Sequence, residues 1–331
     1  MSKLQLTFAC GLYDRMQALY TGEVSAEGID LNFLAIDNPR EIFDRMGGGL
    51  EFDACEMSSS ETISRLSAGN SPLVALPVFA SRVFRHGHIA INKKKGIKTP
   101  KDLEGKRIGV PLYTQTAAIF IRGLLQHEYG VDLGKVRWVQ GALNSAGAHG
   151  NPSAPPLLKP VEIEQNHSGK SLSDLLAEGA LDAITGADLP KSFYTHPDTV
   201  GRLFPNYRDL EKDYYKRTKI FPIMHLIAIR RELYEKHPFI ATSLFNALET
   251  SKNKALEKMR FLGALRYMMP WLQDDVAEID DVFGGDPWPY GIEPNRPTLQ
   301  ALVNYLAEQS LIKAPIPLED IFVAVHGRGT H

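Results

Sequence analysis

The chain has little cysteine: its 331 residues contain only Cys10 and Cys55, and their positions form no metal-binding pattern. Both lie at the ends of predicted strands, so we expect reduced, buried and unreactive thiols. No apolar run approaches the roughly 18 residues that cross a bilayer. The first residues lack the long apolar region of a signal peptide. These absences predict a soluble, cytoplasmic protein without a membrane partner.

An excess of charge of either sign is also missing, because the formal net charge is -2 and no run of basic residues is longer than 93–95. We therefore expect no nucleic-acid partner. The sequence contains no Walker loop and no dinucleotide-binding fingerprint, which argues against a nucleotide cofactor. It also contains no H-x-x-x-H spacing, so it carries no short metal-binding signature.

Strand-like and helix-like segments alternate through the first two thirds of the chain. Strands are predicted at 4–10, 29–36, 52–55, 107–110, 136–139 and 183–185. Helices are predicted at 14–20, 39–46, 60–68, 116–129, 172–179 and 207–217, and then at 238–259, 262–274 and 297–309. This alternation is typical of parallel sheets with helices on both faces. In such sheets ligands bind beyond the carboxyl ends of the strands.

Two long apolar segments that contain histidine, 75–92 and 220–229, are interpreted as strand crossings between two lobes. The first lobe is then 1–92 together with 219–331, including the C-terminal helices, and the second lobe is 93–218. A chain that crosses twice between lobes is typical of proteins that close on a small ligand held in a cleft.

The first crossing carries a basic cluster of Arg82, Arg85, His86 and His88. In an extended strand, Arg82, His86 and His88 share one face with Phe84, and Arg85 points the other way. Burying cationic side chains is costly without an anionic partner. The cluster therefore predicts either an anionic ligand or protein carboxylates that neutralise it.

Four motifs in register resemble 4,5-dihydroxyphthalate decarboxylases: DRMQAL at 14–19, FDACEMSSS at 52–60, GVPLYTQTA at 109–117 and FPIMH at 221–225. The resemblance covers nearly the whole chain. It implies an α/β fold like that of type II periplasmic binding proteins, with two lobes that each hold a mostly parallel sheet flanked by helices. It also implies non-oxidative decarboxylation of a dihydroxylated aromatic dicarboxylate, 4,5-dihydroxyphthalate to protocatechuate, in phthalate degradation.

That chemistry assigns roles to particular side chains. His86 and His225 are candidates for delivering a proton to the ring, because imidazole titrates near neutral pH. Asp14 and Glu56 are candidates for pairing with the phenols. The substrate-binding candidates are arginines that clamp carboxylates and polar groups at the amino ends of helices: Arg15, Arg82, Arg85, Ser58, Ser59, Tyr113, Thr114, Gln115, Thr116 and Gly186.

Several alternatives stay open. A bound divalent metal is one alternative, because His86, His225 and Glu56 are chemically adequate ligands for Zn²⁺, Mn²⁺ or Fe²⁺. Assembly as a homo-oligomer is another. Arg15 could simply pair with Asp14, and the serines could only cap a helix. The competing function is a solute-binding protein of an ABC transporter for an aromatic or carboxylated ligand. A third is a biosynthetic enzyme of the same fold, of either the menaquinone-pathway or the thiamine-pyrimidine type. The thiamine-pyrimidine type needs a cysteine-rich motif, which two isolated cysteines do not supply.

Overall fold

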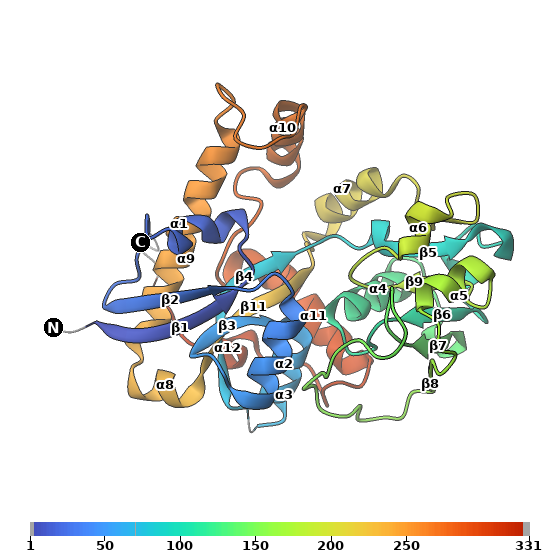
Figure 1. Cartoon of the computed structure of the whole chain (residues 1–331), viewed down its shortest axis with the longest axis horizontal. Coiled ribbons are helices and arrows are strands. Elements are labelled where there is room, and N and C mark those ends of the chain that lie inside the picture. Colours follow the sequence, from blue (N-terminus) through green and yellow to red (C-terminus); the bar gives the residue numbers. More distant parts are fainter. Residues whose placement is uncertain (1–2, 70, 327–331) are drawn as a thin grey trace. The chain divides into compact units, whose positions relative to one another are not determined.

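A computed structural model describes residues 3–69 and 71–326, and the chain divides into two compact units (Figure 1). Unit 1 comprises residues 1–81, 225–299 and 316–331, and unit 2 comprises residues 82–224 and 300–315. The sequence predicts divisions after residues 92 and 218 instead. Residues 82–92 fall in unit 2 because β5 (Ile89–Asn92) pairs with β9 (Ala183–Thr185) of the second sheet.

Unit 1 is built on a mixed sheet in the order β2-β1-β3-β11-β4. The first three strands are parallel, and β11 runs antiparallel to β3. The strands are β1 (Leu4–Cys10), β2 (Ile29–Ala35), β3 (Ala54–Ser58), β4 (Leu73–Arg82) and β11 (Ile223–Arg230). The helices are α1 (Gln17–Tyr20), α2 (Pro39–Gly49), α3 (Ser59–Ser67), α8 (Arg231–Lys236), α9 (Phe239–Arg260), α10 (Leu272–Phe283) and α12 (Leu318–Ile321), with α11 (Arg296–Glu308) shared between the units.

Local sequence signals set the helices that follow β2 and β3. Asn38 caps α2 by accepting from the backbone N–H of Arg40, and Pro39 occupies the first helical position, where its missing N–H costs nothing. Ser58 caps α3 by accepting from the N–H of Glu61. The amino end of α3 therefore starts directly at the carboxyl end of β3. The unit gains its stability from apolar side chains on the strands and on one face of α2 and α9.

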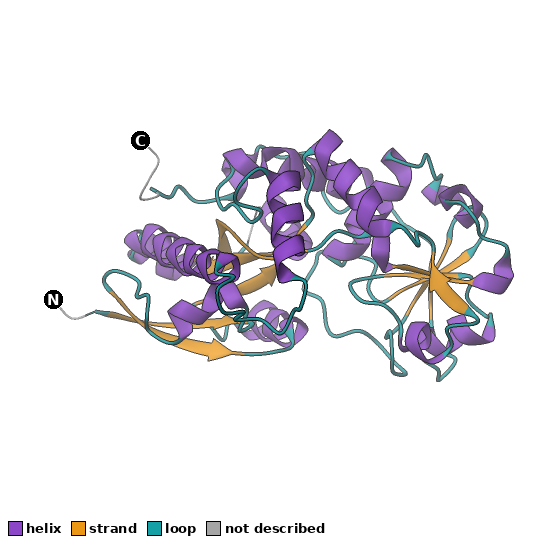
Figure 2. Ribbon diagram, turned by 90° about the horizontal axis from the view of Figure 1, so that it is seen from above, coloured by secondary structure: helices purple, strands orange, loops and turns teal. Residues whose placement is uncertain are grey.

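Unit 2 contains a second mixed sheet in the order β10-β5-β9-β6-β7-β8. Figure 2 shows helices above and below the fanned strands of this sheet. Besides β5 and β9, its strands are β6 (Arg107–Val110), β7 (Arg137–Gln140), β8 (Ile163–Gln165) and β10 (Val200–Arg202). Its helices are α4 (Thr116–His127), α5 (Leu172–Glu178), α6 (Lys191–Thr195) and α7 (Tyr207–Thr218). None of the described helices of either unit is long and apolar enough to cross a membrane.

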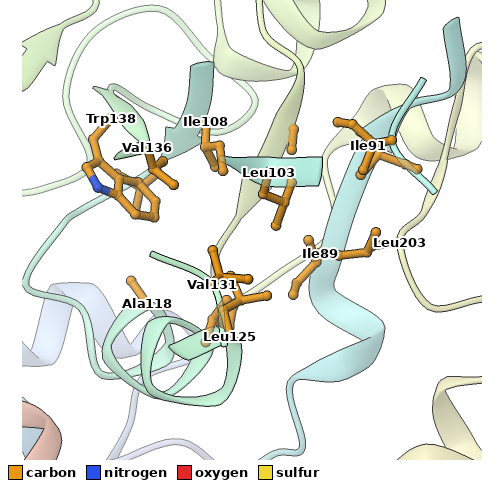
Figure 3. Packing of buried hydrophobic residues seen from close by; sticks show 14 of the residues in the cluster. Ile89, Ile91, Leu103, Ile108, Ala118, Leu125, Val131, Val136, Trp138 and Leu203 are labelled. Atoms are coloured by element: carbon orange, nitrogen blue, oxygen red, sulfur yellow. The ribbon is translucent and has the colours of Figure 1, made fainter. Parts of the chain in front are cut away.

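Unit 2 has two buried apolar clusters, one that includes α4 and one that includes Leu172 and Leu176 of α5. Ile89, Ile108 and Trp138 project from three strands and belong to the same buried cluster as Ala118 and Leu125 of α4 (Figure 3). Because both faces of these strands are covered, their sequences are almost continuously apolar rather than alternating.

The prediction that 75–92 forms one continuous strand is wrong. β4 ends at Arg82 and β5 begins at Ile89, with a 3-10 turn at His86–His88 between them. Glycine at position 87 allows the turn to pack against Tyr207, because a Cβ there would lie only 2.8 Å from the Tyr207 ring. Without a strand between 83 and 88, the alternation of faces expected for the basic cluster does not apply.

The prediction of a helix over 262–274 is also wrong. The structure has a non-helical connection over 261–271, and α10 starts only at Leu272. Gly263 and Pro270 both oppose a helix there, glycine through its conformational entropy and proline through its missing N–H. The apolar residues that suggested a helix remain largely exposed instead.

Candidate functional site

The centre of the candidate site in unit 1 is a buried carboxylate, Glu56, on β3. It has no exposed surface, and four groups bind its two oxygens. The hydroxyl of Tyr13 lies 2.8 Å from Oε1, and the N–H of Gly11 lies 3.1 Å from Oε2. The third partner is His225, whose Nδ1 lies 2.5 Å from Oε1. The fourth is the thiol of Cys10, whose Sγ lies 3.4 Å from Oε2. A carboxylate that accepts several hydrogen bonds is stabilised in its charged form.

Two opposing effects set the ionisation of Glu56. Burial by itself would raise its pKa, but the charge and hydrogen bond of His225, with the bonds from Gly11 and Tyr13, lower the pKa overall. Burial and the neighbouring Glu56 charge raise the pKa of the Tyr13 phenol and of the Cys10 thiol. The site therefore holds one negative charge, on Glu56, beside a phenol and a thiol that stay protonated.

His225 is the part of this network that reaches the surface. It lies on β11 opposite Ser58 of β3, and its side chain keeps 20% of its area exposed. Its ring packs edge-on against Phe43 of α2, with 4.9 Å between the ring centroids. Because Nδ1 is bonded to Glu56, the other nitrogen, Nε2, is the one that can exchange a proton with a bound molecule.

Tyr13 lies in the segment 13–15 that the rule on strand ends indicates, but the sequence assigned it no role in the site. Its side chain folds back over Gly11, so that a Cβ on Gly11 would lie only 2.6 Å from the Tyr13 ring. Gly11 thus donates its N–H to Glu56 and also leaves room for the tyrosine that donates the second bond. The sequence signal for Tyr13 is its position, because residues 13–15 follow the carboxyl end of the first strand.

Arg15 lies beside this network in the same unit. Its guanidinium is sandwiched between the rings of Tyr13 and Trp288, at 4.2 and 4.5 Å from their centroids. Nε donates to the carbonyl of Ala80 at 2.8 Å, Nη2 donates to the same oxygen, and Nη1 donates to Asp14. Among the described residues these are three bonds, and a guanidinium has five N–H donors. Arg15 is therefore rigidly held and still able to bind an anion.

Trp288 was not predicted as a site residue. It lies far along the chain, in the loop after α10, and its indole N–H donates to the carbonyl of Phe79 at 2.7 Å. That bond helps to hold the ring in contact with Arg15. Nothing in the local sequence indicates this contact, since it joins segments more than 200 residues apart.

The remaining predicted residues of unit 1 have clear local roles. Asp14 is half-exposed and accepts from both the N–H and the guanidinium of Arg15. The hydroxyl of Ser58 caps α3. Ser59 is buried beside it, and among the described residues its hydroxyl has no hydrogen-bond partner. Ser59 is thus the serine with a donor to spare at the carboxyl end of β3.

Unit 2 contains the two predicted arginine clamps. Arg82 donates to the carbonyl of Phe221 at 2.9 Å and lies over the ring of the same residue. Arg85 donates to the carbonyl of Ala187 and contacts the sulfur of Met224. Burial lowers the pKa of Arg85 to about 9, although Glu211 and Asp188 oppose that effect. The role of both arginines in binding substrate stays a prediction.

His86 lies in aromatic packing, almost fully buried, in contact with the rings of Tyr129, Phe204 and Tyr214. Burial, with the charge of Arg217, lowers its pKa to about 4. A histidine that is neutral and enclosed in this way is a weaker proton donor than His225. Because His86 belongs to unit 2 and His225 to unit 1, the expectation that they face each other stays a prediction.

The predicted polar segment 113–116 lies before and at the start of α4 in unit 2. The N–H of Tyr113 donates to Gln140, and its carbonyl accepts from the fully buried Arg122. Gln115 stands at the cap position of α4 without a side-chain cap bond, and Thr116 starts the helix. Gly186 packs against Pro111, where a Cβ would lie 3.0 Å away. Ligand binding by this segment, including Thr114, remains a prediction.

The metal candidates do not form a group in the structure. Within residues 3–69 and 71–326, no three His, Cys, Asp or Glu side chains come together as metal ligands. Glu56 and His225 are in direct contact, whereas His86 lies in the other unit. The hydrogen bond between Glu56 and His225 accounts for the position of both side chains.

Comparison with known proteins identifies close relatives. The family model described as NMT1/THI5 like matches residues 24–151. The chain is 37% identical over 295 residues to a 4,5-dihydroxyphthalate decarboxylase from Comamonas testosteroni, and the match covers 89% of each chain. It is also 37% identical over 216 residues to a 4,5-dihydroxyphthalate decarboxylase from Pseudomonas putida, covering 65% of this chain and 83% of the relative.

Solved structures confirm the predicted fold class. The periplasmic aliphatic sulphonate binding protein of Escherichia coli superposes with a TM-score of 0.55 at 11% identity, covering 97% of this chain and 98% of that one. A putative periplasmic sulfonate-binding protein of Methylobacillus flagellatus gives a TM-score of 0.54 at 12% identity, covering 97% and 92%. At such low identity these similarities show the fold alone, an α/β fold of the periplasmic-binding-protein type.

Proposed function

The chain belongs to the 4,5-dihydroxyphthalate decarboxylase family, and from this membership we propose that it is a carboxy-lyase acting on a dihydroxylated aromatic dicarboxylate. The substrate we propose is 4,5-dihydroxyphthalate, with protocatechuate as the product, as a step of phthalate degradation. The structural observation that carries the chemistry is the bond between buried Glu56 and partly exposed His225. Such a pair can hold a proton and deliver it to a bound ring.

The proposed substrate activates itself for this reaction. In 4,5-dihydroxyphthalate each ring carbon that bears a carboxylate lies para to a hydroxyl group. That hydroxyl donates electron density to the carbon and makes it basic enough to accept a proton. The protein must therefore supply an acid at the ring carbon and hold the two carboxylates in place.

His225 is the proposed acid. The imidazolium donates the Nε2 proton to the ring carbon that carries the departing carboxylate. The bond from the ring to that carboxylate then breaks, its electron pair restores the aromatic ring, and carbon dioxide leaves. His225 is left neutral and takes a proton from water, so each turnover consumes one proton.

Glu56 is the proposed positioning residue. Its carboxylate accepts the Nδ1 proton of His225, which orients the ring and stabilises the imidazolium. Because Glu56 has no exposed surface, it acts through the histidine rather than on the phenols directly. The hydroxyl of Tyr13 and the N–H of Gly11 fix the carboxylate in turn.

Arg15 is the proposed binding residue for a carboxylate of the substrate. It is joined to the acid pair through Tyr13, whose ring contacts the guanidinium and whose hydroxyl bonds Glu56. Its side chain is 15% exposed, and the aromatic rings on either side keep the guanidinium plane fixed. A fixed plane is what bidentate carboxylate binding requires.

The test is direct. Purified protein is incubated with 4,5-dihydroxyphthalate, and release of carbon dioxide and formation of protocatechuate are measured together. We expect stoichiometric amounts of both with the wild type and neither with the His225→Gln variant. Binding of the diacid, seen as a rise in melting temperature, without release of carbon dioxide would instead support the solute-binding alternative that the fold also permits.

A cytoplasmic location is part of the proposal. The two cysteines support it, because both are buried free thiols, as expected in a reducing compartment. Fractionation of the native cells, with the protein detected by antibody, tests the location; recovery in the periplasmic fraction would contradict it.

A further inference from the structure

The connection between α9 and α10, residues 261–271, concentrates exposed apolar side chains on one segment of unit 1. Of the large apolar side chains that are exposed in the described chain, six lie here: Phe261, Leu262, Leu265, Met268, Met269 and Trp271. Met268 is fully exposed and Trp271 is 75% exposed. Scattered exposed apolar residues are ordinary, but a contiguous group is typical of an interaction site.

This segment is anchored at its base. Arg260, at the end of α9, donates to Asp280 of α10 at 2.6 Å and to the carbonyl of Gly285 at 2.9 Å. Within the segment, the N–H of Met269 donates to Tyr267, and the carbonyl of Trp271 accepts from the start of α10. The connection is therefore a defined loop between α9 and α10 (Figure 1).

The size of the patch matches an interface between protein chains. If a large apolar side chain has roughly 200 Å² of surface, these six expose on the order of 700 Å² between them. The largest patch on a typical monomer is about 300–600 Å². A stable interface buries about 800 Å² on each partner. The patch is thus large for a free surface and close to what one side of a dimer needs.

The charges around the patch favour a second copy of this chain as the partner. At the end of α9, Lys258 pairs with Glu23 and Arg260 pairs with Asp280 of the same chain. Arg266 supplies a positive charge within the segment itself. On the other side, one stripe of α10 is acidic: Asp274, Asp275, Glu278 and Asp281. A two-fold axis through the patch can bring Arg266 of each copy to the acidic stripe of the other. The acidic stripe also disfavours an anionic lipid surface.

We propose that residues 261–271 form the centre of a two-fold interface between two copies of this chain. Trp271 and Met268 are the side chains expected to contribute most, because large and fully desolvated apolar groups dominate such interfaces. The proposal is independent of the catalytic assignment, since it involves the exposed side chains of this segment and none of the groups bonded to Glu56.

The test measures mass in solution. Light scattering after size-exclusion chromatography is applied to the wild type, to the double variant Met268→Glu/Trp271→Glu and to Tyr194→Glu as a control. Tyr194 is also a highly exposed aromatic residue, but it lies on α6 of unit 2. Melting temperature shows whether each variant is folded, and the single variants Met268→Glu and Trp271→Glu replace the double variant if it is not.

We expect the wild type and Tyr194→Glu to run at a multiple of the 36.8 kDa chain mass. We expect the double variant to dissociate at least tenfold more readily. The proposal is overturned if the wild type stays at the single-chain mass at about 100 μM, or if the double variant assembles like the wild type. It is equally overturned if a monomeric wild type binds phosphatidylglycerol vesicles through this segment.

Discussion

Oε1 of Glu56 and Nδ1 of His225 lie 2.5 Å apart, although the two residues are separated by 169 positions in the sequence. The contact arises because β11 returns antiparallel beside β3, which places His225 opposite Ser58 and Ile227 opposite Glu56. A charged hydrogen bond of this kind is stronger than one between neutral groups. It places a buried carboxylate beside a partly exposed imidazole, and the proposed delivery of a proton to the ring depends on this arrangement.

Replacing Glu56 by Gln should lower kcat about 10²- to 10⁴-fold, the usual contribution of a positioned acid or base. The amide cannot stabilise the imidazolium of His225, but it keeps the shape of the side chain. Binding of the diacid should change little, because Glu56 is buried and does not contact it. Steady-state kinetics and calorimetric titration measure the two effects separately. A variant with wild-type kcat would remove Glu56 from the mechanism.

Tyr13→Phe is a milder change in the same hydrogen-bond network. It removes one of the bonds to Glu56 but keeps the aromatic ring under Arg15. We expect kcat to fall by about tenfold, because a hydrogen bond to a charged group contributes about 1.5–3 kcal/mol, with KM nearly unchanged. A large rise in KM without loss of kcat would show that the hydroxyl serves binding instead.

Arg15→Lys should raise KM by about tenfold or more with a smaller effect on kcat. Lysine keeps the charge, but it lacks the planar group that stacks between two rings and binds a carboxylate through two N–H donors. Arg45→Lys is the matched control. Arg45 also lies over an aromatic ring, that of Phe52, and pairs with Glu41 and Glu51. Equal KM changes in the two variants would argue against a specific role for Arg15.

Gly11→Ala should destabilise unit 1 by about 1–3 kcal/mol, the usual cost of adding a methyl group where there is no room. The new Cβ would lie 2.6 Å from the ring of Tyr13 and displace the side chain that bonds Glu56. Gly48→Ala is the control, because no atom lies within 4 Å of its added Cβ. Urea unfolding followed by tryptophan fluorescence measures both. A Gly11→Ala protein as stable as the control would contradict the packing described here.

His86→Phe should make the stability of the protein less dependent on pH between about 6.5 and 4.5. Burial lowers the pKa of His86 and of His88 to about 4. The unfolded chain therefore binds more protons at these sites, and stability falls as the pH falls. Burial raises the pKa of Glu211 to about 7, which has the opposite effect in an overlapping range.

In this pH range the unfolded chain binds about one more proton at each of the two histidines, and the folded chain binds about one more at Glu211. The net difference of about one proton makes the free energy of unfolding change by about 1.4 kcal/mol per pH unit. Without His86 the remaining two groups oppose each other, and the slope should approach zero. Thermal unfolding at several pH values measures this slope, and His196→Gln, at an exposed position, is the control. A slope unchanged by His86→Phe would show that its burial does not govern the acid sensitivity. Turnover by the same variant also tests which histidine donates the proton. If His86 were the donor, the His86→Phe variant would have no activity.

Local patterns predicted much of the architecture. The apolar segments before the turns at 11–13 and 37–38 gave β1 and β2 within one residue, and Asn38-Pro39 and Ser58 marked the starts of α2 and α3. These signals are local because a cap or a first-turn proline acts on neighbouring backbone groups. The break at 83–88 was missed, because it depends on Gly87 packing against Tyr207, which is distant in sequence.

The sequence by itself determined the types of groups available to the site, including Glu56, His225 and Arg15, and the segments of the chain that carry them. Only the tertiary structure decided which of them act together. It joined His225 to Glu56 through an antiparallel strand pair and placed Trp288 over Arg15, and it enclosed His86 among aromatic rings. The physical reason is that hydrogen bonding and burial set the charge and reach of a side chain, and both depend on residues far away along the chain.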